Sequence, residues 1–509
     1  MKVKRFKGGV ALAGLAVALF VSVLPASSVS AQTTGPAAQV QVSPKHKEAF
    51  AAFEARVKEY VSLRESIEGK MPKLSKDAKP EEIEAHKAAL QNAVRAARAS
   101  AKQGDIFTPV AVGHIREVIK SDAPARVKRE VRETVIESEV KSVPLRVNYA
   151  YPDSQELLEM TPTLLLRLPQ LPKQVRYRFV NGNLLLVDRE NGLIIDYMTD
   201  ALPAPQAGSQ TASSSTEGAT PGGANVGARV ATTARPVSGL GLTLPNKNDS
   251  VRFMVVGDTG TGSRQQNELA GVMQRYRQEF PFEFALMMGD NLYGSEKAVD
   301  YKKKFEEVYQ PLLDEKVKFY ATLGNHDESN ERFYENFNMN GEEYYNFKKG
   351  NVSFYSLNSN YMDKKQLAWF EEKLKADTSR WKVAFFHHPP YSSGGKHGSS
   401  TGLREVIEPL FLKYGVNVVF AGHEHFYERL KPQNGIYYFI SGAGGKLREG
   451  DVRDNSPLTA KAYDTDLSFM LLEVAGDEMH FQCINRLGQT VDSGVITLQR
   501  PKAAAAGSN

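Results

Sequence analysis

Cysteine is almost absent, because the 509-residue chain contains Cys483 alone. A single thiol cannot close an internal disulfide, so each domain has to be stable without one. It also excludes a metal site built from several thiolates, and any metal must therefore take oxygen and nitrogen ligands. Cys483 lies in the alternating run 479–484, which predicts a strand in which the thiol is a small core residue.

The chain also has little excess charge of either sign and few long apolar runs. The formal net charge of +5 is small for this length, and no basic stripe is interleaved with aromatic residues, so nucleic acid is not expected as a structural partner. A hydrophobic content of 41% with 24% charged residues is typical of a soluble protein. The length favours two globular units. After Pro25, no segment is apolar enough to span a bilayer.

The first residues have the pattern of a targeting segment. The basic segment 2–7 precedes the apolar run 8–24, and Val29-Ser30-Ala31 has the small residues of a cleavage site. We therefore expect residues 1–31 to be a cleaved signal peptide and the mature protein to be periplasmic or secreted. Because the apolar run approaches spanning length, an uncleaved anchor is the alternative, and only then is the membrane a partner.

Residues 32–200 are predicted to form a smaller α+β module of unknown role. Apolar residues recur at helical spacing from about 44 to 140, and Asn181-Gly182 marks a hairpin between two strand-like segments. We see no catalytic or metal-ligating cluster in this module, so contact with the cell envelope is the role considered for it. The composition of residues 201–248 predicts a flexible linker, and residues 501–509 are expected to be a disordered tail.

Residues 249–500 alternate between strand and helix patterns. This alternation indicates a layered α/β catalytic domain, and the consecutive late strands predict that one sheet is mixed or antiparallel. The expected helices include Gln265–Gln278, Lys364–Ala376 and Leu403–Tyr414. The expected strands are Val251–Val256, Phe284–Met288, Val317–Leu323, Val352–Leu357, Val383–Phe386, Val416–Phe420, Ile436–Ile440 and Leu467–Val474.

Five short motifs directly follow expected strands. Four of them open with glycine, which permits a tight turn and a close approach of the backbone to an ion or a phosphate. In open α/β sheets, such positions meet at the carboxyl edge of the strands, where ligands bind. The motifs are Gly257-Asp258-Thr259-Gly260, Gly289-Asp290-Asn291-Leu292-Tyr293, Gly324-Asn325-His326-Asp327, His387-His388-Pro389 and Gly422-His423-Glu424-His425.

The side chains in these motifs suit a pair of metal ions. Asp258 and Asp290 offer carboxylates, Asn325 offers an amide oxygen, and the last two motifs offer imidazoles. Asp290 can bridge two cations, because each carboxylate oxygen can bind one. Two ions about 3.5–4 Å apart acidify a shared water and neutralise phosphoryl oxygens, which is most of what phosphoryl transfer requires. The residues thus predict a binuclear metal hydrolase.

Each motif has a simpler interpretation when it is taken alone. A Gly-Asp-x-Gly sequence is usually a turn, and a histidine pair before Pro389 is uninformative by itself. His423 and His425 are the strongest single signal, because alternate residues of an extended segment point the same way. The recurrence of ligand types at successive strand ends favours a metal site over a set of ordinary turns.

The motifs resemble those of the calcineurin-like metallophosphoesterase superfamily over roughly residues 250 to 495. The segment 289–293 is similar to the purple, or tartrate-resistant, acid phosphatase branch, in which a tyrosine three residues after the bridging aspartate binds ferric iron. Segments such as 440–444 are similar to the small tartrate-resistant form, whereas 426–429 looks more like the plant-type enzymes. The resemblance implies a four-layer α/β/β/α sandwich.

The same resemblance implies two metal ions, Fe(III) in a first site and a divalent Fe, Zn or Mn ion in a second. The residues implied for the first ion are Asp258, Asp290, Tyr293 and His425. Those implied for the second are Asp290, Asn325, His387 and His423. His387 is preferred over His388 because the histidine ligand of the family lies two residues before proline.

Two further histidines are implied on the substrate side. His326 would contact the phosphate or the leaving group. His397, followed by Gly398, resembles a second such histidine, although its spacing from His387 differs slightly from that of the family. Both are expected to assist departure of the leaving group by general acid chemistry.

Tyr293 bears on whether the first metal is ferric. A phenol pKa near 10 makes tyrosine a poor ligand for Zn or Mn at neutral pH, whereas a ferric ion can deprotonate it. We therefore expect a ferric tyrosinate. The alternative is a tyrosine ring that packs beside a dimetal site of another composition.

Residues and resemblance together predict an exported, acid phosphatase-like phosphohydrolase. It would hydrolyse small phosphomonoesters by direct attack of a metal-bound hydroxide, and the monoester preference comes from the resemblance. One alternative is a phosphodiesterase or nucleotide hydrolase that uses the same site. Another is an envelope-associated binding protein in which the metal domain is secondary.

Overall fold

The structure is a computed structural model that describes residues 44–122, 145–150, 160–180, 182–202 and 240–498. The predicted signal peptide, most of the predicted linker and the predicted tail lie outside the described residues. The described residues belong to one compact unit. None of the helices in the described ranges combines the length and the hydrophobicity that a membrane span requires.

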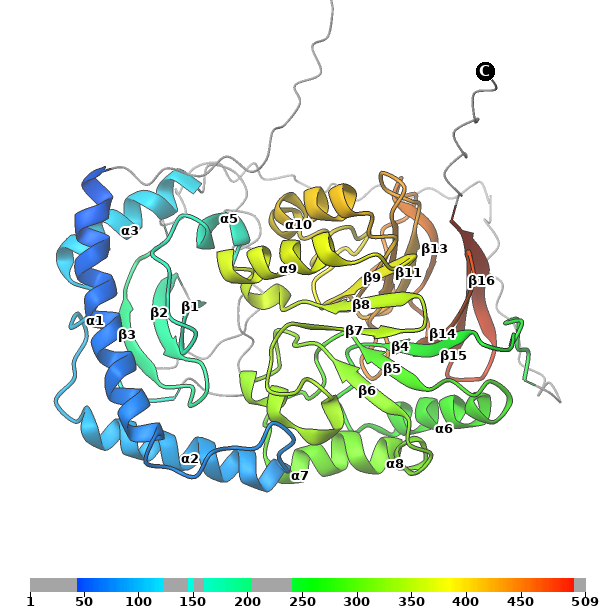
Figure 1. The fold of residues 1–509 in the computed structure, drawn as a ribbon, viewed down its shortest axis with the longest axis horizontal. Coiled ribbons are helices and arrows are strands. Elements are labelled where there is room, and N and C mark those ends of the chain that lie inside the picture. The colour runs from blue at the N-terminus through cyan, green and yellow to red at the C-terminus, as the bar shows by residue number, and fades with distance from the viewer. Residues whose placement is uncertain (1–43, 123–144, 151–159, 181, 203–239, 499–509) are drawn as a thin grey trace, which may run out of the picture. The chain divides into compact units, whose positions relative to one another are not determined.

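The first part of the described chain is the expected α+β module. Its core holds apolar residues of both the helices and the sheet, such as Phe53, Ile115 and Leu186, and Figure 1 shows the helices grouped around the sheet. The helices are α1 (Pro44–Glu68), α2 (Pro80–Ala97), α3 (Pro109–Asp122) and α5 (Pro162–Leu165). The antiparallel sheet has the order β1 (Val175–Val180), β2 (Asn183–Asp188), β3 (Ile194–Met198).

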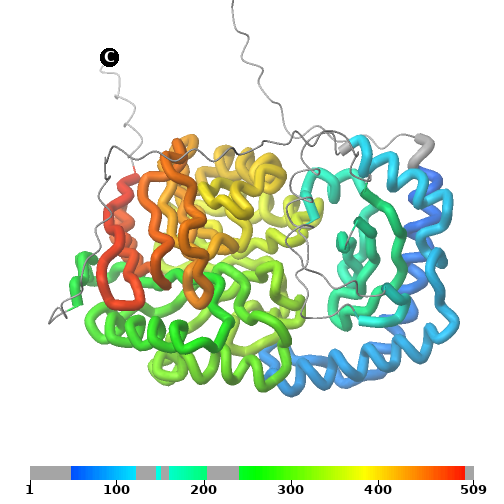
Figure 2. Tube along the Cα trace, turned by 180° about the vertical axis from the view of Figure 1, so that it is seen from behind, coloured from blue at the N-terminus to red at the C-terminus, as the bar shows by residue number. Residues whose placement is uncertain are grey.

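The first sheet of the C-terminal domain is mixed and has the order β16-β15-β14-β4-β5-β6. Its first three strands along the chain pair in parallel, and the last three pair antiparallel. Figure 2 shows β16 in red at the edge of the domain. The strands are β4 (Val251–Val256), β5 (Phe284–Met287), β6 (Lys318–Ala321), β14 (Ser468–Ala475), β15 (Glu478–Asn485) and β16 (Thr490–Thr497). Cys483 is buried in β15, as predicted.

The second sheet has the order β13-β11-β12-β10-β9-β8-β7 and is also mixed. Its four inner parallel strands, β8, β9, β10 and β12, were expected from the sequence. The other three pair antiparallel with their neighbours and were not expected. The strands are β7 (Tyr345–Lys349), β8 (Val352–Ser356), β9 (Trp381–Phe385), β10 (Val418–Ala421), β11 (Tyr427–Leu430), β12 (Tyr437–Ser441) and β13 (Thr459–Tyr463).

The two sheets pack face to face and are covered by helices on both outer sides. Phe253 and Val255 of β4 belong to the same buried core as Phe420 of β10, between the sheets. Met254 and Val256, which alternate with them, pack in a second core with residues of α6 and α8. Helices α9 and α10 cover the other sheet, and Figure 1 shows the two helix pairs on opposite sides. The order of layers is therefore α/β/β/α, as expected.

Capping residues set the ends of several helices in this domain. The Ser263 and Asp363 side chains accept hydrogen bonds from backbone N–H groups three residues later, at the starts of α6 and α9. Gly415 ends α10 with a left-handed φ of 71°. The helices are α6 (Arg264–Glu279), α7 (Ala298–Tyr301), the π turn η1 (Lys302–Glu306), α8 (Glu307–Asp314), the 3-10 turns η2 (Ser329–Phe333), η3 (Glu335–Phe337) and η4 (Ser359–Tyr361), α9 (Lys364–Ala376) and α10 (Thr401–Tyr414).

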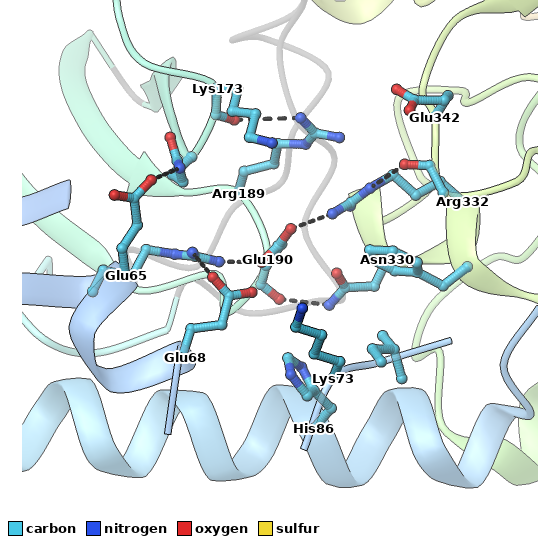
Figure 3. A pocket seen from close by; sticks show the side chains of 16 residues that line it. Glu65, Glu68, Lys73, His86, Lys173, Arg189, Glu190, Asn330, Arg332 and Glu342 are labelled. Carbon is cyan, nitrogen blue, oxygen red and sulfur yellow. Dashed lines mark hydrogen bonds and ion pairs between the residues drawn. The ribbon is translucent and has the colours of Figure 1, made fainter. Parts of the chain in front are cut away.

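A shared carboxylate joins the module to the C-terminal domain. Glu190, which follows β2, forms ion pairs with Arg64 of α1 and with Arg332 of η2, and its backbone carbonyl accepts a hydrogen bond from Asn330 at 2.5 Å. These residues line a pocket of about 480 Å³, shown in Figure 3. Because both guanidinium groups already bind carboxylates, we interpret this network as an anchoring contact.

A second shared carboxylate, Glu343, makes the same kind of link. It lies buried just before β7 and forms ion pairs with Arg176 of β1 and with Arg189. Its other oxygen accepts a hydrogen bond from Asn358 Nδ2 at 3.0 Å. Two acidic residues, the partly buried Glu190 of the module and the buried Glu343 of the domain, thus hold the two parts together.

Candidate metal centre

The loops that follow five parallel strands bring predicted ligands together. Asp258 follows β4, Asp290 follows β5 and Asn325 follows β6, and these strands are neighbours in the first sheet. His387 follows β9 and His423 follows β10, which are neighbours in the second sheet. The five side chains therefore come from the carboxyl ends of strands, where α/β sheets bind ligands.

Asp258, Tyr293 and His425 form a first group of donor atoms. The Tyr293 hydroxyl lies 3.2 Å from Asp258 Oδ1 and 3.3 Å from His425 Nε2. The same imidazole nitrogen lies 3.5 Å from Asp258 Oδ1. Two oxygens and one nitrogen from three separate motifs are thus close enough to share one ion.

Asn325, His387 and His423 form a second group. Asn325 Oδ1 lies 2.8 Å from His387 Nε2 and 3.0 Å from His423 Nδ1, and the two imidazole nitrogens are 3.2 Å apart. The neighbouring His388 instead places its Nδ1 2.9 Å from the Ser359 hydroxyl. The geometry therefore favours His387 over His388 as the donor toward Asn325.

Asp290 lies between the two groups. Its Oδ1 is 3.4 Å from His387 Nε2 in the second group. One donor atom each from Asp290, Asp258 and His425 lie within 4.8 Å of one another in the first group. The same Oδ1 accepts the backbone N–H of His326 at 3.0 Å. This is the position that a carboxylate bridging two ions requires.

The hydrogen bonds of His387 fit a cation at the second group. Its Nδ1 lies 2.8 Å from the Met288 carbonyl, and only a protonated nitrogen can donate to a carbonyl oxygen. In the neutral ring, Nε2 then carries a lone pair that points at Asn325 Oδ1, which is also an acceptor. A bound cation would satisfy both acceptors, and the Met288 carbonyl would hold the ring in the ligand orientation.

Three of these residues have a left-handed backbone. The φ angles are 56° for Asp258, 50° for Asp290 and 69° for His423. Such conformations cost a non-glycine residue on the order of 1–3 kcal/mol and persist where surrounding contacts hold them. Here the Asp258 amide donates to the Gly289 carbonyl at 2.9 Å, and the His423 amide donates to Asp258 Oδ2 at 2.9 Å. Contacts between the motif loops therefore hold the backbone of Asp258 and His423 in this conformation.

The protonation states in the metal-free protein follow from burial and neighbouring charges. Burial opposes ionisation of Asp290, but the nearby histidines, His387 first, hold its pKa below the ordinary value. Burial and then the surrounding histidines lower the pKa of His423 well below its ordinary value. Burial and then the two aspartates raise the pKa of Tyr293 well above its ordinary value. Asp290 and His423 are thus ready to ligate, whereas the Tyr293 phenol needs a strongly acidic cation.

Both histidines expected on the substrate side lie beside the donor groups. The His326 ring centroid is 4.9 Å from that of Tyr293, and the His397 centroid is 4.2 Å from that of His423. Burial, followed by the charge of Arg448, lowers the pKa of His397 to about 3. His397 is therefore neutral before an anion binds, and a bound phosphate would favour its protonated form.

Two cationic side chains at the site were not predicted. Lys446 Nζ lies 3.6 Å from the centroid of the Tyr293 ring. Arg448 Nη2 lies 3.4 Å from His425 Nδ1. Both residues belong to the loop after β12, for which the sequence analysis named no site residue. The one available signal was positive charge in a glycine-rich loop.

Glu424, in the centre of the last motif, has a positioning role that the sequence did not reveal. Its Oε1 accepts hydrogen bonds from the Ser392 hydroxyl at 2.9 Å and from the Gly398 amide at 2.7 Å. The side chain is fully buried, and burial followed by the charge of Asp451 raises its pKa to about 7. Glu424 therefore holds the loop that carries His397.

Comparisons with known proteins cover this same part of the chain. Residues 251–427, which include all five motifs, match the family described as calcineurin-like phosphoesterase. Purple acid phosphatase 17 of Arabidopsis thaliana is 27% identical over an alignment of 290 residues, which covers 46% of this chain and 85% of the relative. Tartrate-resistant acid phosphatase type 5 of Oryctolagus cuniculus is 28% identical over an alignment of 238 residues, which covers 38% of this chain and 73% of the relative.

A further relative and a solved structure are matched over about half of their own length. Purple acid phosphatase 18 of Arabidopsis thaliana is 30% identical over an alignment of 254 residues, which covers 42% of this chain and 55% of the relative. The structure of purple acid phosphatase PPD1 from yellow lupin aligns with a TM-score of 0.43 and 19% identity, over 50% of this chain and 55% of that chain.

Proposed function

Because the C-terminal domain belongs to the calcineurin-like phosphoesterase family, in its purple acid phosphatase-like branch, we propose that this metallophosphoesterase hydrolyses phosphomonoesters at a binuclear metal centre. The observation that carries the proposal is the position of Asp290, which contacts both donor groups. A carboxylate in that position can be shared by two ions, and a shared carboxylate keeps them close enough to act on one phosphate.

The two donor groups differ in their ligand atoms, and we assign a different metal ion to each. The first group, Asp258, Tyr293 and His425 with Asp290, includes a phenol that only a strongly acidic ion deprotonates at neutral pH, and we assign Fe(III) to it. The second group has a neutral amide and two imidazoles with Asp290, which suits a divalent Fe, Zn or Mn ion. When bound, the two ions supply an acidified water and positive charge toward the phosphoryl oxygens.

The surrounding side chains have separate roles in the proposal. Lys446 and Arg448 lie next to the first donor group and would bind the phosphoryl oxygens of the substrate. His326 and His397 flank the two groups on either side. A phosphate held between them would favour protonated imidazoles, which can then donate a proton to the leaving oxygen.

The experiment that tests this function is replacement of the shared carboxylate. Asp290→Asn keeps the shape of the side chain but removes its charge, so we expect phosphatase turnover to fall by at least about 10³-fold and the bound metal to be reduced. Asp314→Asn, at an exposed position at the end of α8, is the matched control and should leave both unchanged. Retained turnover in Asp290→Asn would contradict the proposal.

A second comparison defines the substrate class. Purified protein is assayed with a chromogenic phosphomonoester and with a chromogenic phosphodiester under the same conditions. We expect the monoester to have the higher kcat/KM. A preference for the diester would assign the same metal centre to a phosphodiesterase or nucleotide hydrolase.

The proposal for the whole chain includes export. Residues 1–31 would be a signal peptide, 32–200 a module, 201–248 a linker and 249–500 the catalytic domain. N-terminal sequencing of the protein recovered from the periplasm or the medium should begin at Gln32. Recovery in the membrane fraction with Met1 intact would instead support an anchor.

A further inference from the structure

Three acidic side chains outside the two donor groups form a cluster of their own. Glu296 precedes α7, Asp327 ends the third motif and Glu331 lies in η2. One carboxylate oxygen of each lies within 4.8 Å of those of the other two. Glu331 is 0% exposed and Asp327 is 6% exposed, so two of the three carboxylates are buried, and the third, on Glu296, is half-buried.

The partners of Asp327 are hydrogen-bond donors without charge. Its Oδ1 accepts the Asn291 amide at 2.8 Å and the Leu292 amide at 3.2 Å, and its Oδ2 accepts the Gly324 amide at 2.8 Å. The side-chain nitrogen of Asn291 also contacts Asp327 Oδ2, at 3.0 Å, and Glu331 Oε2, at 2.9 Å. These bonds orient the carboxylates but leave their charge unpaired.

Among the ion pairs found in the described ranges, none includes Glu296, Asp327 or Glu331. Lys87 of α2 binds the adjacent Glu328 at 2.5 Å. The charge of Lys87 lowers the pKa of Glu296, but burial and the charges of Glu328 and Asp327 outweigh this effect and raise the pKa. Burying a charge without a partner is strongly unfavourable. The cluster therefore needs either a cation or protons that its members share.

Orphaned polar atoms supply an independent indication of a missing partner. Glu296 Oε2 and Glu331 Oε1 are buried without a hydrogen-bond partner. The hydroxyl of Tyr301, a residue 1% exposed, is likewise without a partner. Burial, and then the charges of Glu296 and Glu331, raise the pKa of Tyr301. Asn291 Oδ1 is a further buried acceptor without a partner.

We propose that Glu296, Asp327 and Glu331 bind a hard divalent cation, Ca²⁺ or Mg²⁺. The available donors are oxygens, with no imidazole or thiolate among the three residues, and this set suits these two ions rather than Zn or Cu. The cation would balance most of the buried charge and bind the two orphaned carboxylate oxygens. Glu296 is half-buried, which leaves a side on which an ion and its waters can enter.

The position of this cation suggests a structural role. Asp327 and Asn291 belong to the motifs that supply Asn325 and Asp290, so the cation would fix the loops that carry two ligands of the metal centre. The module reaches the same region, because Glu84 Oε2 accepts the Ala298 amide at 3.0 Å. A cation here would stabilise the contact of α2 with the start of α7 as well.

The test is a cation titration of the full chain with its catalytic metals in place. We expect Ca²⁺ or Mg²⁺, added separately as the chloride, to raise the thermal midpoint and to bind at one equivalent per chain in equilibrium dialysis. Glu331→Gln and Glu296→Gln should abolish both effects. Glu335→Gln, an exposed neighbour in η3, should keep them.

The variant Asp290→Asn distinguishes this site from the catalytic centre. In this variant, Ca²⁺ or Mg²⁺ should still raise the thermal midpoint. If Glu331→Gln fails to fold, the proposal is still tested by Glu296→Gln, at a half-buried position, and by the number of Ca²⁺ or Mg²⁺ ions bound per wild-type chain. A wild-type midpoint that neither ion moves would overturn the proposal. The proposal would also be overturned if Ca²⁺ or Mg²⁺ raised the thermal midpoint of both glutamine variants. A Glu331→Gln protein more stable than wild type would overturn it too, because that result would indicate carboxyls that share protons.

Discussion

At the scale of single residues, the candidate metal centre is a set of acceptor atoms that lie close to one another. In the neutral form of His387, the Met288 carbonyl fixes the proton on Nδ1, so Nε2 turns a lone pair toward Asn325. The carboxylate of Asp290 stays ionised, because neighbouring histidines offset the effect of burial on its pKa. An arrangement of this kind is stable when cations occupy it, and the residues that orient the ligands matter as much as the ligands.

Tyr293 gives the sharpest prediction at this scale. If the first ion is Fe(III), the phenolate bound to it should produce a visible charge-transfer band in the iron-loaded protein, and Tyr293→Phe should abolish the band. Tyr344→Phe is the control, because that ring contacts Trp369 and lies outside the donor groups. An absorption spectrum decides the matter, since a band that survives in Tyr293→Phe, or is missing from wild type, would refute the ferric tyrosinate.

At the scale of elements, the candidate ligands lie in the loops that follow the parallel strands. The glycines of these loops allow the loops to pack closely against one another. A Cβ at Gly324, the first residue of the third motif, would collide with the carboxylate and the amide of Asp290. A Cβ at Gly422 would approach Asp258 Oδ2 in the same way. These glycines therefore bring the backbone of one loop against the carboxylate of another.

Gly324→Ala should consequently displace Asp290 and impair catalysis without removing a ligand. A displacement of about 1 Å at a catalytic group can lower turnover by roughly 10²-fold, and we expect a loss of that size with weaker metal retention. Gly271→Ala in α6 is the matched control, because the nearest atom its Cβ would meet, in the Arg275 side chain, is 3.9 Å away. Steady-state kinetics on both variants tests this, and wild-type turnover in Gly324→Ala would show that the loops can move apart freely.

At the scale of the whole molecule, the module is connected to the ligand loops. Glu343 pairs with Arg176 of the module and accepts a hydrogen bond from Asn358 of the domain. Two residues further on, Asn360 Nδ2 donates to the Gly324 carbonyl at 2.8 Å. The contact between module and domain is therefore continuous with the backbone that positions Asn325.

Removing one partner from this buried network should destabilise the protein. Glu343→Gln leaves Arg176 and Arg189 without a counter-charge, and the free energy of unfolding should fall by about 3–5 kcal/mol. Glu342→Gln, the exposed neighbour, should change it little. Urea denaturation of the two variants compares them directly, and equal stability would mean that the network contributes no net anchoring.

The same carboxylate predicts a pH dependence. Burial opposes ionisation of Glu343, but Arg176 and Arg189 hold its pKa below the ordinary value. Its contribution to stability is therefore complete above the pKa of an unfolded glutamate, about 4.3, and is lost as the pH falls toward the lower folded value. The difference in unfolding free energy between wild type and Glu343→Gln should accordingly shrink on acidification below about pH 4.

The sequence predicted the inner strands and the ligand motifs because both are local signals. The run Val251–Val256 is apolar except for Arg252 and forms β4 with the same bounds, and each motif lies directly after such a run. Strands β7 and β13 escaped prediction because residues such as Lys348 and Lys461 interrupt the apolar pattern. Their pairing is set by neighbouring strands, which no local pattern reveals.

Long-range charge contacts were also beyond the sequence. Glu190 and Arg332 are 142 positions apart, and nothing in either segment indicates that they form an ion pair. Glu296, Asp327 and Glu331 look like ordinary surface acids until the fold buries them together. Lys446 and Arg448 reach the metal centre through a glycine-rich loop whose path depends on tertiary packing.

Anomalous X-ray diffraction from crystals of the metal-loaded protein tests the central claim most directly. The account predicts two strong peaks about 3.5–4 Å apart, one beside Asp258 and His425 and the other beside Asn325 and His387, with the Asp290 carboxylate between them. A single peak, or two peaks that do not share Asp290, would contradict it.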